Sequence, residues 1–242
     1  MAKGQRLDKI LAHLGYGSRR EIRELCKKGL VVIDGKAVKD SSMHVNPEES
    51  EIKVNGEAIN YREFVYIMLN KPQGVISATE DNRHETVIDL LDKEYKSFEV
   101  FPVGRLDIDT EGLLILTNDG QLAHRVLSPK KHVPKTYYSK VEGVVTEEDI
   151  RAFKAGVTLE DGYETLPAIL KIINSSEVSE IELTIFEGKF HQVKRMFEAV
   201  GKKVIYLQRI KMGALELDDS LELGEYRELT ETEMELLTTI EV

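Results

Sequence analysis

Three carboxylates lie close together near the middle of the chain, in the segment GRLDIDTEG at residues 104–112, and they are Asp107, Asp109 and Glu111. Arg105 precedes the first of them by two positions. Glycines at both ends of the segment indicate tight turns between two apolar, strand-like runs. A rigid loop of this kind can present a carboxylate as a nucleophile or a base, or it can cap a sheet. The residues alone leave both alternatives open.

Other patterns that carry chemistry are missing from the sequence. It has no GxxxxGK[ST] or GxGxxG phosphate loop and no GxSxG turn, and its six histidines show no HExxH or HxxxH spacing. The single cysteine, Cys26, excludes an internal disulfide. We therefore expect neither a metal site nor an organic cofactor.

The charge of the chain is unevenly distributed. The total is −10, but residues 1–46 carry a net +5 and residues 214–242 a net −9. Two further stretches, residues 121–141 and 189–211, are strongly basic. Local basic patches bind phosphates whatever the total charge, so three of them favour a nucleic-acid partner over a solvated surface.

The first 60 residues predict a small domain of two helices and a hairpin. Apolar residues at positions 7, 10, 11 and 14 have helical spacing, and Ser18 with Glu21 forms the sequence of a capping box. Asp34-Gly35 indicates a tight turn between strands. On the second helix a basic stripe, suited to phosphate contact, consists of Arg20, Arg23 and Lys27.

Residues 61–242 predict a larger domain, which makes the chain α+β with a mainly antiparallel sheet in its second domain. We predict strands over residues 64–69, 100–103, 113–117, 137–141, 169–173, 181–186 and 204–210. We predict helices over residues 86–91, 121–127, 147–155 and 191–200. The acidic stretch from residue 214 is interpreted as packing and solubility.

The N-terminal segment RLDKILAHLGYGSRREIRELCKKGLVVIDGKAV resembles the RNA-binding module first described in ribosomal protein S4, over about residues 5–50. The resemblance implies RNA contacts by the basic residues of this module. They are Arg6, Arg19, Arg20, Arg23 and Lys27.

Four motifs of the larger domain resemble, in order, those of the ribosomal small-subunit pseudouridine synthase A family. They are YIMLNKPQG, GRLDIDTEGLLILTNDG, the pair SP and KTY around residues 128–137, and EGKFHQVKRMF. The resemblance implies an enzyme that isomerises one uridine of ribosomal RNA to pseudouridine. The residues of the first two motifs resemble those of the small-subunit branch more than those of its large-subunit relatives.

The resemblance also implies roles for individual residues. Asp107 would attack the nucleoside or deprotonate its ribose, and Tyr137 would stack on the target base. Lys194 would pair with Asp107 where related synthases carry arginine, with Arg195 as the alternative partner. Arg105 would fill the space that the flipped uridine leaves. Further RNA contacts are expected from Lys71, Arg125, Lys135 and Arg195, whereas Asp109 and Glu111 are interpreted as structural.

We expect a cytoplasmic monomer that acts on ribosomal RNA within a partly assembled small subunit. No apolar run approaches the ~18 residues that span a bilayer. The alternatives are a large-subunit ribosomal RNA synthase of the same family, a catalytically silent RNA-binding assembly factor, and a hydrolase of glycosides or nucleosides.

Overall fold

A computed structural model describes residues 4–238, which form two compact units. The first unit comprises the chain up to Val65 together with Leu91–Val100, and the second comprises Tyr66–Leu90 and the chain from Phe101 onward. The sequence assigns Leu91–Val100 to the domain that begins at residue 61, but the contacts of this segment lie in the first unit.

The first unit contains the two predicted helices, α1 (Leu7–His13) and α2 (Arg19–Lys27). Ser18 and Glu21 form the capping box, because Ser18 Oγ accepts from the Glu21 amide at 3.3 Å and the Glu21 carboxylate accepts from the Ser18 amide at 2.7 Å. These bonds satisfy amides that the first turn of α2 leaves unpaired. The basic side chains of α2 therefore project from a well-defined helix.

Short strands and one short helix complete the first unit. One sheet has the order β3-β2-β5-β6 and a second pairs β1 with β4. The elements are β1 (Gln5–Arg6), β2 (Val31–Ile33), β3 (Lys36–Ala37), β4 (His44–Val45), β5 (Ile52–Val54), β6 (Glu57–Ala58) and α3 (Lys93–Ser97). Apolar residues of both helices and of β2 and β5 share one core.

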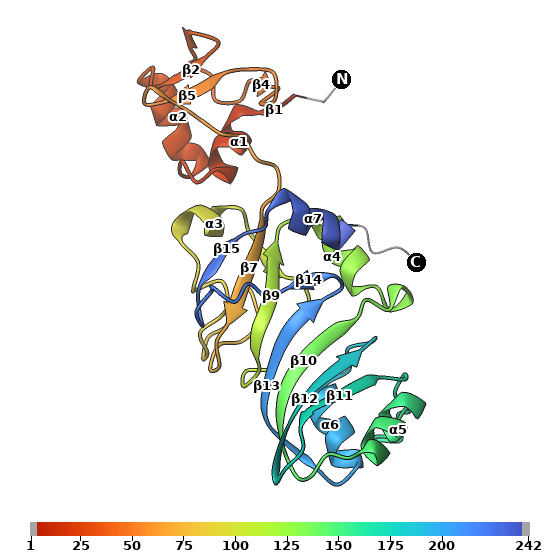
Figure 1. The fold of residues 1–242 in the computed structure, drawn as a ribbon. Helices are drawn as coiled ribbons and strands as arrows, with labels where there is room; N and C mark the ends of the chain where they lie inside the picture. Colours follow the sequence, from red (N-terminus) through yellow and green to blue (C-terminus); the bar gives the residue numbers. More distant parts are fainter. Residues whose placement is uncertain (1–3, 239–242) are drawn as a thin grey trace. The chain divides into compact units, whose positions relative to one another are not determined.

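The second unit is built on one sheet with the main order β11-β12-β10-β13-β9-β7-β15 (Figure 1). The pairs are antiparallel apart from β13 with β9, which run parallel. The strands are β7 (Tyr66–Lys71), β8 (Phe101–Pro102), β9 (Glu111–Thr117), β10 (Lys135–Glu142), β11 (Ile169–Asn174), β12 (Val178–Ile185), β13 (Lys203–Met212), β14 (Leu215–Glu216) and β15 (Tyr226–Glu228). The predicted α+β class with a mainly antiparallel sheet is confirmed.

Four helices and one 3-10 turn accompany this sheet. They are α4 (Gly120–Leu127), η1 (Pro129–Lys131), α5 (Glu147–Ala155), α6 (Gln192–Ala199) and α7 (Glu231–Thr238). Helix α5 contacts β11 and α6 contacts β13 (Figure 1).

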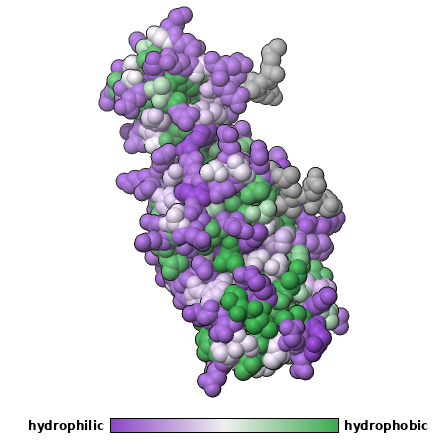
Figure 2. All heavy atoms as spheres, in the orientation of Figure 1, coloured by the Kyte–Doolittle hydropathy of each residue, from purple (hydrophilic) through white to green (hydrophobic). Residues whose placement is uncertain are grey.

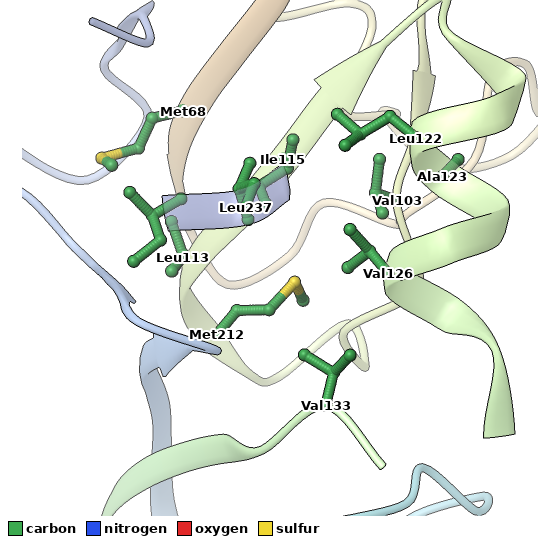
Figure 3. Close-up of a cluster of buried hydrophobic side chains, with 11 residues drawn as sticks. Met68, Val103, Leu113, Ile115, Leu122, Ala123, Val126, Val133, Met212 and Leu237 are labelled. Carbon is green, nitrogen blue, oxygen red and sulfur yellow. The ribbon is translucent and has the colours of Figure 1, made fainter. Parts of the chain in front are cut away.

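One helix of this unit differs from the sequence prediction. Residues 86–91 form turns: Thr86 and Asp89 bond reciprocally as in a capping box, but the next helix, α3, begins only at Lys93. The packing expected of the acidic stretch from residue 214 is present, because Leu237 of α7 is buried among the residues shown in Figure 3.

The core anchors the GRLDIDTEG loop at both ends. Val103, which precedes the loop, and Leu113 and Ile115, which follow it on β9, are fully buried in one apolar cluster with Met68 and residues of α4 (Figure 3). Burial of side chains of this size contributes about 1.5–3 kcal/mol each. The loop therefore starts and ends on the most rigid part of the unit.

The face of the molecule drawn in Figure 2 is mainly hydrophilic, with apolar side chains gathered over the part of the second unit that carries β10–β13. Ile169, Ile173, Val178 and Ile205 are exposed on these strands. In the described residues no helix is long and apolar enough to cross a membrane.

Candidate active site

A cavity of about 450 Å³ lies within the second unit, next to the GRLDIDTEG loop. Its walls come from that loop, from η1, from β10 and β13, and from the connection between β12 and α6. Small-molecule sites are of this size, so the cavity can receive a single nucleoside. Residues from three of the four resembling motifs line it, including Arg105, Asp107, Tyr137 and His191.

Lys71 supports the backbone of the GRLDIDTEG loop. Its side chain is fully buried, and Nζ donates to the carbonyl oxygens of Pro72 at 2.9 Å, Asp107 at 3.0 Å and Thr110 at 3.0 Å. Burial lowers the pKa of Lys71 to about 8, although Asp109 and Asp107 act in the opposite direction. The predicted RNA contact by Lys71 is therefore wrong, because its ammonium group is enclosed and already bonded.

Two further contacts fix the backbone of this loop. Ser77 Oγ accepts from the Leu106 amide and donates to the Leu106 carbonyl, both at 3.0 Å. The Gly74 amide donates to the carbonyl of Ile108 at 2.8 Å. The segment that begins with YIMLNKPQG thus positions the carboxylates rather than meeting substrate itself.

Lys194 joins two of the three carboxylates. From α6, its Nζ lies 3.1 Å from Asp107 Oδ2 and 2.6 Å from Asp109 Oδ1. Burial opposes ionisation of Asp109, but the hydrogen bond and charge of Lys194 lower its pKa below the ordinary value. Burial likewise opposes the charge on Lys194, but the two carboxylates raise its pKa. Lys194 thus favours the charged form of Asp109 and places its ammonium group beside Asp107, which lines the cavity.

His191 approaches the same carboxylate from the other side. Its Nε2 lies 3.6 Å from Asp107 Oδ1, and its backbone has the left-handed φ of 48°. A non-glycine residue in this region is uncommon and costs about 1 kcal/mol or more. Asp107 therefore lies between Lys194 and a histidine that the preceding turn aims at it.

Tyr137 and Leu207 supply an apolar surface to the cavity. Both line it, on the neighbouring strands β10 and β13, and both are buried.

Glu111, the third carboxylate, is buried and accepts from the Tyr206 hydroxyl at 2.6 Å. Burial and the bond to Glu111 raise the pKa of Tyr206. This contact ties β9 to β13.

Two cations, the buried Arg209 and the partly buried Lys135, also line the cavity. Arg209 is 2% exposed, and its Nε donates to the Leu113 carbonyl at 2.8 Å, whereas Nη2 has no hydrogen-bond partner among the described residues. Lys135 Nζ donates to the Val133 carbonyl at 2.9 Å. Burial, with a smaller effect of Arg209, lowers the pKa of Lys135 to about 8. Lys135 thus belongs to the cavity wall.

The remaining predicted RNA contacts are divided between the two units. In the first unit Arg19, Arg20 and Arg23 are exposed on α2. Arg6 pairs with Asp8 at 2.6 Å and Lys27 with Glu24 at 2.8 Å. In the second unit Arg125 is exposed on α4 and Arg105 is exposed at the cavity.

Arg195 is committed elsewhere. Its Nη2 pairs with Asp161 Oδ2 at 2.5 Å, so it is not the partner of Asp107. Lys194, the first of the two predicted partners, occupies that position. The two residues are neighbours on α6 but point to different groups, which the sequence could not distinguish.

His191 and Arg209 line the cavity, although the sequence predicts no role for them there. His191 lies in the motif EGKFHQVKRMF, three positions before Lys194, and this proximity is the available signal. Arg209 meets the cavity through the pairing of β13 with β10, and no spacing in the sequence indicates that. Asp109 does not line the cavity but pairs with Lys194.

Comparison with known proteins identifies the domains. Residues 65–199 match the family model described as RNA pseudouridylate synthase, and residues 5–51 match the S4 domain. YtzG, an uncharacterized RNA pseudouridine synthase of Bacillus subtilis, is 58% identical over 96% of this chain and 98% of its own length.

Relatives with assigned substrates are of two kinds. The ribosomal small subunit pseudouridine synthase A of Yersinia pestis is 44% identical, over 95% of this chain and 96% of its own. The ribosomal large subunit pseudouridine synthase B of Bacillus subtilis is 41% identical, over 98% of this chain and 96% of its own. A crystal structure of a pseudouridylate synthase, 40% identical, covers 96% of this chain and 99% of its own with a TM-score of 0.68.

Matches of this extent cover both units and the cavity that carries Asp107, and they agree with the order of the four motifs. The chain therefore belongs to the RNA pseudouridine synthase family, as an enzyme that converts uridine to pseudouridine and carries an N-terminal S4 domain.

Proposed function

We propose that the enzyme modifies one uridine of small-subunit ribosomal RNA and that Asp107 initiates the reaction. The observation that carries the catalytic assignment is the ion pair of Asp107 with Lys194, at 3.1 Å beside a nucleoside-sized cavity. A carboxylate that lines a nucleoside-sized pocket and pairs with a lysine is suited to act on the ribose of a bound nucleotide.

The reaction is an isomerisation in which atoms balance without a co-reactant. Asp107 acts on the ribose, either by attack at C1′ or by removal of a proton, and the bond from C1′ to N1 of uracil breaks. The detached base turns and C5 bonds to C1′, as the bond from Asp107 to C1′ breaks or as the ribose regains the proton that Asp107 removed. The proton on C5 is then lost while N1 gains one. Lys194 places a positive charge beside Asp107, and Tyr137 stacks on the base throughout.

The uridine must leave its stack to enter the cavity. Arg105 is exposed and lines the cavity two residues before Asp107, where it can occupy the space that the nucleotide leaves. Leu207 lies on the cavity wall and supports the base from the side of β13. Arg19, Arg20 and Arg23 of the S4 domain would contact phosphates elsewhere on the RNA.

The proposal of a small-subunit substrate rests on the residues of YIMLNKPQG and GRLDIDT, which resemble the small-subunit branch more than the large-subunit branch. The relatives with assigned substrates include both classes at similar identity, 44% and 41%. We further propose that the enzyme is a cytoplasmic monomer acting on a partly assembled subunit, since the cavity requires an RNA strand that is still accessible.

The test is pseudouridine mapping of both ribosomal RNAs from a strain that lacks the gene, by carbodiimide labelling and primer extension. In this assay a labelled pseudouridine stops reverse transcriptase. We expect one such stop to disappear from the small-subunit RNA, and to return when the strain receives the wild-type gene but not the Asp107→Asn gene. Glu216→Gln is the matched control, because Glu216 is also a carboxylate paired with a lysine, Lys211 at 2.8 Å, but does not line the cavity, and it should restore the stop.

Purified Asp107→Asn should still bind the same RNA, because the substitution removes a charge and little volume. Activity above about a tenth of wild type would contradict the assignment of Asp107. A stop lost from the large-subunit RNA would keep the chemistry and assign the enzyme to the class of the Bacillus subtilis relative.

A further inference from the structure

An aromatic side chain stands exposed beside the cavity. Phe190, in the connection between β12 and α6, leaves 72% of its surface exposed. One face of its ring stacks on the ring of His191, with centroids 3.7 Å apart and an angle of 19° between the planes. An exposed phenylalanine contributes none of the free energy that its burial would add to folding. An exposed aromatic side chain beside a cavity therefore indicates a binding role.

The turn holds Phe190 in place firmly. Gln192 accepts from the Lys189 amide through Oε1 at 2.9 Å and donates its own amide to the Lys189 carbonyl at 3.2 Å. Its Nε2 also donates to Glu187 at 2.9 Å. The exposure of Phe190 is therefore built into the turn.

The chain neighbours of Phe190 locate it at the mouth of the cavity. Lys189 and His191 both line the cavity, whereas Phe190 between them does not. A base inside the cavity is within reach of Tyr137. A base stacked on Phe190 must belong to a different nucleotide, one that stays outside.

The chemistry of the turn matches single-stranded RNA. Proteins bind unpaired bases by stacking them on aromatic rings, which is worth about 1–3 kcal/mol per base and tolerates any base identity. The outer face of Phe190 supplies such a ring, and Lys189 adds a cation 4.6 Å from the centre of the Tyr163 ring. A nucleotide next to a flipped uridine has lost a stacking neighbour and gains one here.

We propose that the stacked rings of Phe190 and His191 form a binding surface on which the base of a nucleotide next to the target uridine stacks. The proposal rests on the proposed function, since it takes the cavity beside Asp107 as the site of the target. His191 connects the two places, because its ring contacts Phe190 on one face and its Nε2 lies 3.6 Å from Asp107. Phe190 thus binds RNA beside the place where Asp107 meets the target nucleotide.

The experiment measures single-turnover kinetics on unmodified transcripts of the small-subunit and large-subunit ribosomal RNAs, using whichever one the wild-type protein modifies. The variants are Phe190→Ala, Phe190→Leu and Phe190→Tyr. Ile205→Ala is the control, because Ile205 is an exposed apolar residue of the same unit, 51% accessible, on β13.

We expect Phe190→Ala and Phe190→Leu to raise the RNA concentration for half-maximal rate about tenfold, with the maximal rate within threefold of wild type. Phe190→Tyr and Ile205→Ala should match wild type. The salt dependence of binding should be the same in Phe190→Ala as in wild type, because stacking neutralises no phosphate. An unchanged melting temperature shows that the variants fold.

Wild-type affinity of Phe190→Ala would overturn the proposal. Wild-type affinity of Phe190→Leu would also overturn it, since leucine preserves apolar contact but cannot stack. Failure of the proposed function would give a different result from failure of the Phe190 proposal: the wild-type protein itself would then modify neither transcript.

Discussion

A single lysine serves two carboxylates at the centre of the site. An arginine would bind one carboxylate through two parallel bonds, whereas the compact ammonium group of Lys194 lies within 3.1 Å of both Asp107 and Asp109. Asp109 is the more exposed partner, and its contact is shorter. We infer that Asp109 fixes the position of Lys194 and leaves Asp107 accessible to the substrate.

Lys194→Met should reduce turnover about a hundredfold at neutral pH. Without the cation, the carboxylates of Asp107 and Asp109 repel each other and the pKa of Asp109 loses the lowering that Lys194 causes, so the acidic limb of the pH–rate profile moves to higher pH. The measurement is the single-turnover rate between pH 5 and 9. Lys211→Met is the control, because Lys211 also pairs with a carboxylate, Glu216, at 2.8 Å. A Lys194→Met profile that overlays the wild-type one would contradict this role.

At the scale of elements, the sequence predicts what periodicity and turn chemistry determine locally. The capping box at Ser18, helix α5 and the alternating strand β12 agree with prediction, because these residues specify their own backbone. Residues 86–91 carry a similar start signal, yet form turns: Val87 is fully buried, and its amide donates to the carbonyl of Ile76 at 3.0 Å rather than along a helix. Tertiary contacts of this kind override a local signal.

The site was predictable to the same degree. Asp107 and Lys194 were paired from the resemblance, and the structure places them 3.1 Å apart. Lys71 was assigned to RNA by its charge, but it is enclosed by carbonyl oxygens that come from a loop 36 and 39 residues away. No local pattern records which lysine a fold will bury, so this role required the structure.

Gly112 is needed where β9 meets β13. Its φ is +100°, and a Cβ there would collide with the carbonyl oxygen of Arg209 on the parallel strand. We expect Gly112→Ala to lower the free energy of unfolding by about 2–4 kcal/mol. Gly74→Ala has a similar φ of +83° but meets no atom within 4 Å, so it should cost only about 1–2 kcal/mol. Urea denaturation measures both, and equal losses would show that backbone strain alone matters.

Lys71→Met should destabilise the loop that carries Asp107. Three carbonyl oxygens lose their donor, which costs about 2–4 kcal/mol in unfolding free energy and lowers turnover. The cost depends on pH. The pKa of Lys71 is about 8 in the fold and 10.5 as its ordinary value, so between these the unfolded chain binds more protons.

Raising the pH from 7 to 9 therefore stabilises the wild-type protein through Lys71 but not the variant. The difference in unfolding free energy between the two should widen at pH 9, as measured by urea denaturation. Lys130→Met, at an exposed position, should show no such difference. A gap that narrows with pH would mean that the enclosed lysine is stabilised in its charged form.

At the scale of the whole chain, charge is divided between its parts. The acidic residues concentrate in the tail, where α7 packs on the core, and Arg227 of this region pairs with Asp218 and Glu233. The net charge of −10 therefore coexists with a basic helix α2 in the first unit. Phosphate contacts act over about one Debye length of 8–10 Å, so binding by α2 depends on the charges of its own surface and not on the total charge of the chain.

The final prediction tests that separation directly. Replacing Arg19, Arg20 and Arg23 together by alanine should weaken RNA binding and reduce the slope of log K against log salt by about two. The control replaces three other basic residues of the same unit by alanine, with the same change in net charge: Lys36, Lys39 and Lys53. Both variants should melt like wild type, because the replaced side chains lie at the surface. Equal losses of affinity in the two variants would mean that total charge, rather than the α2 surface, binds the RNA.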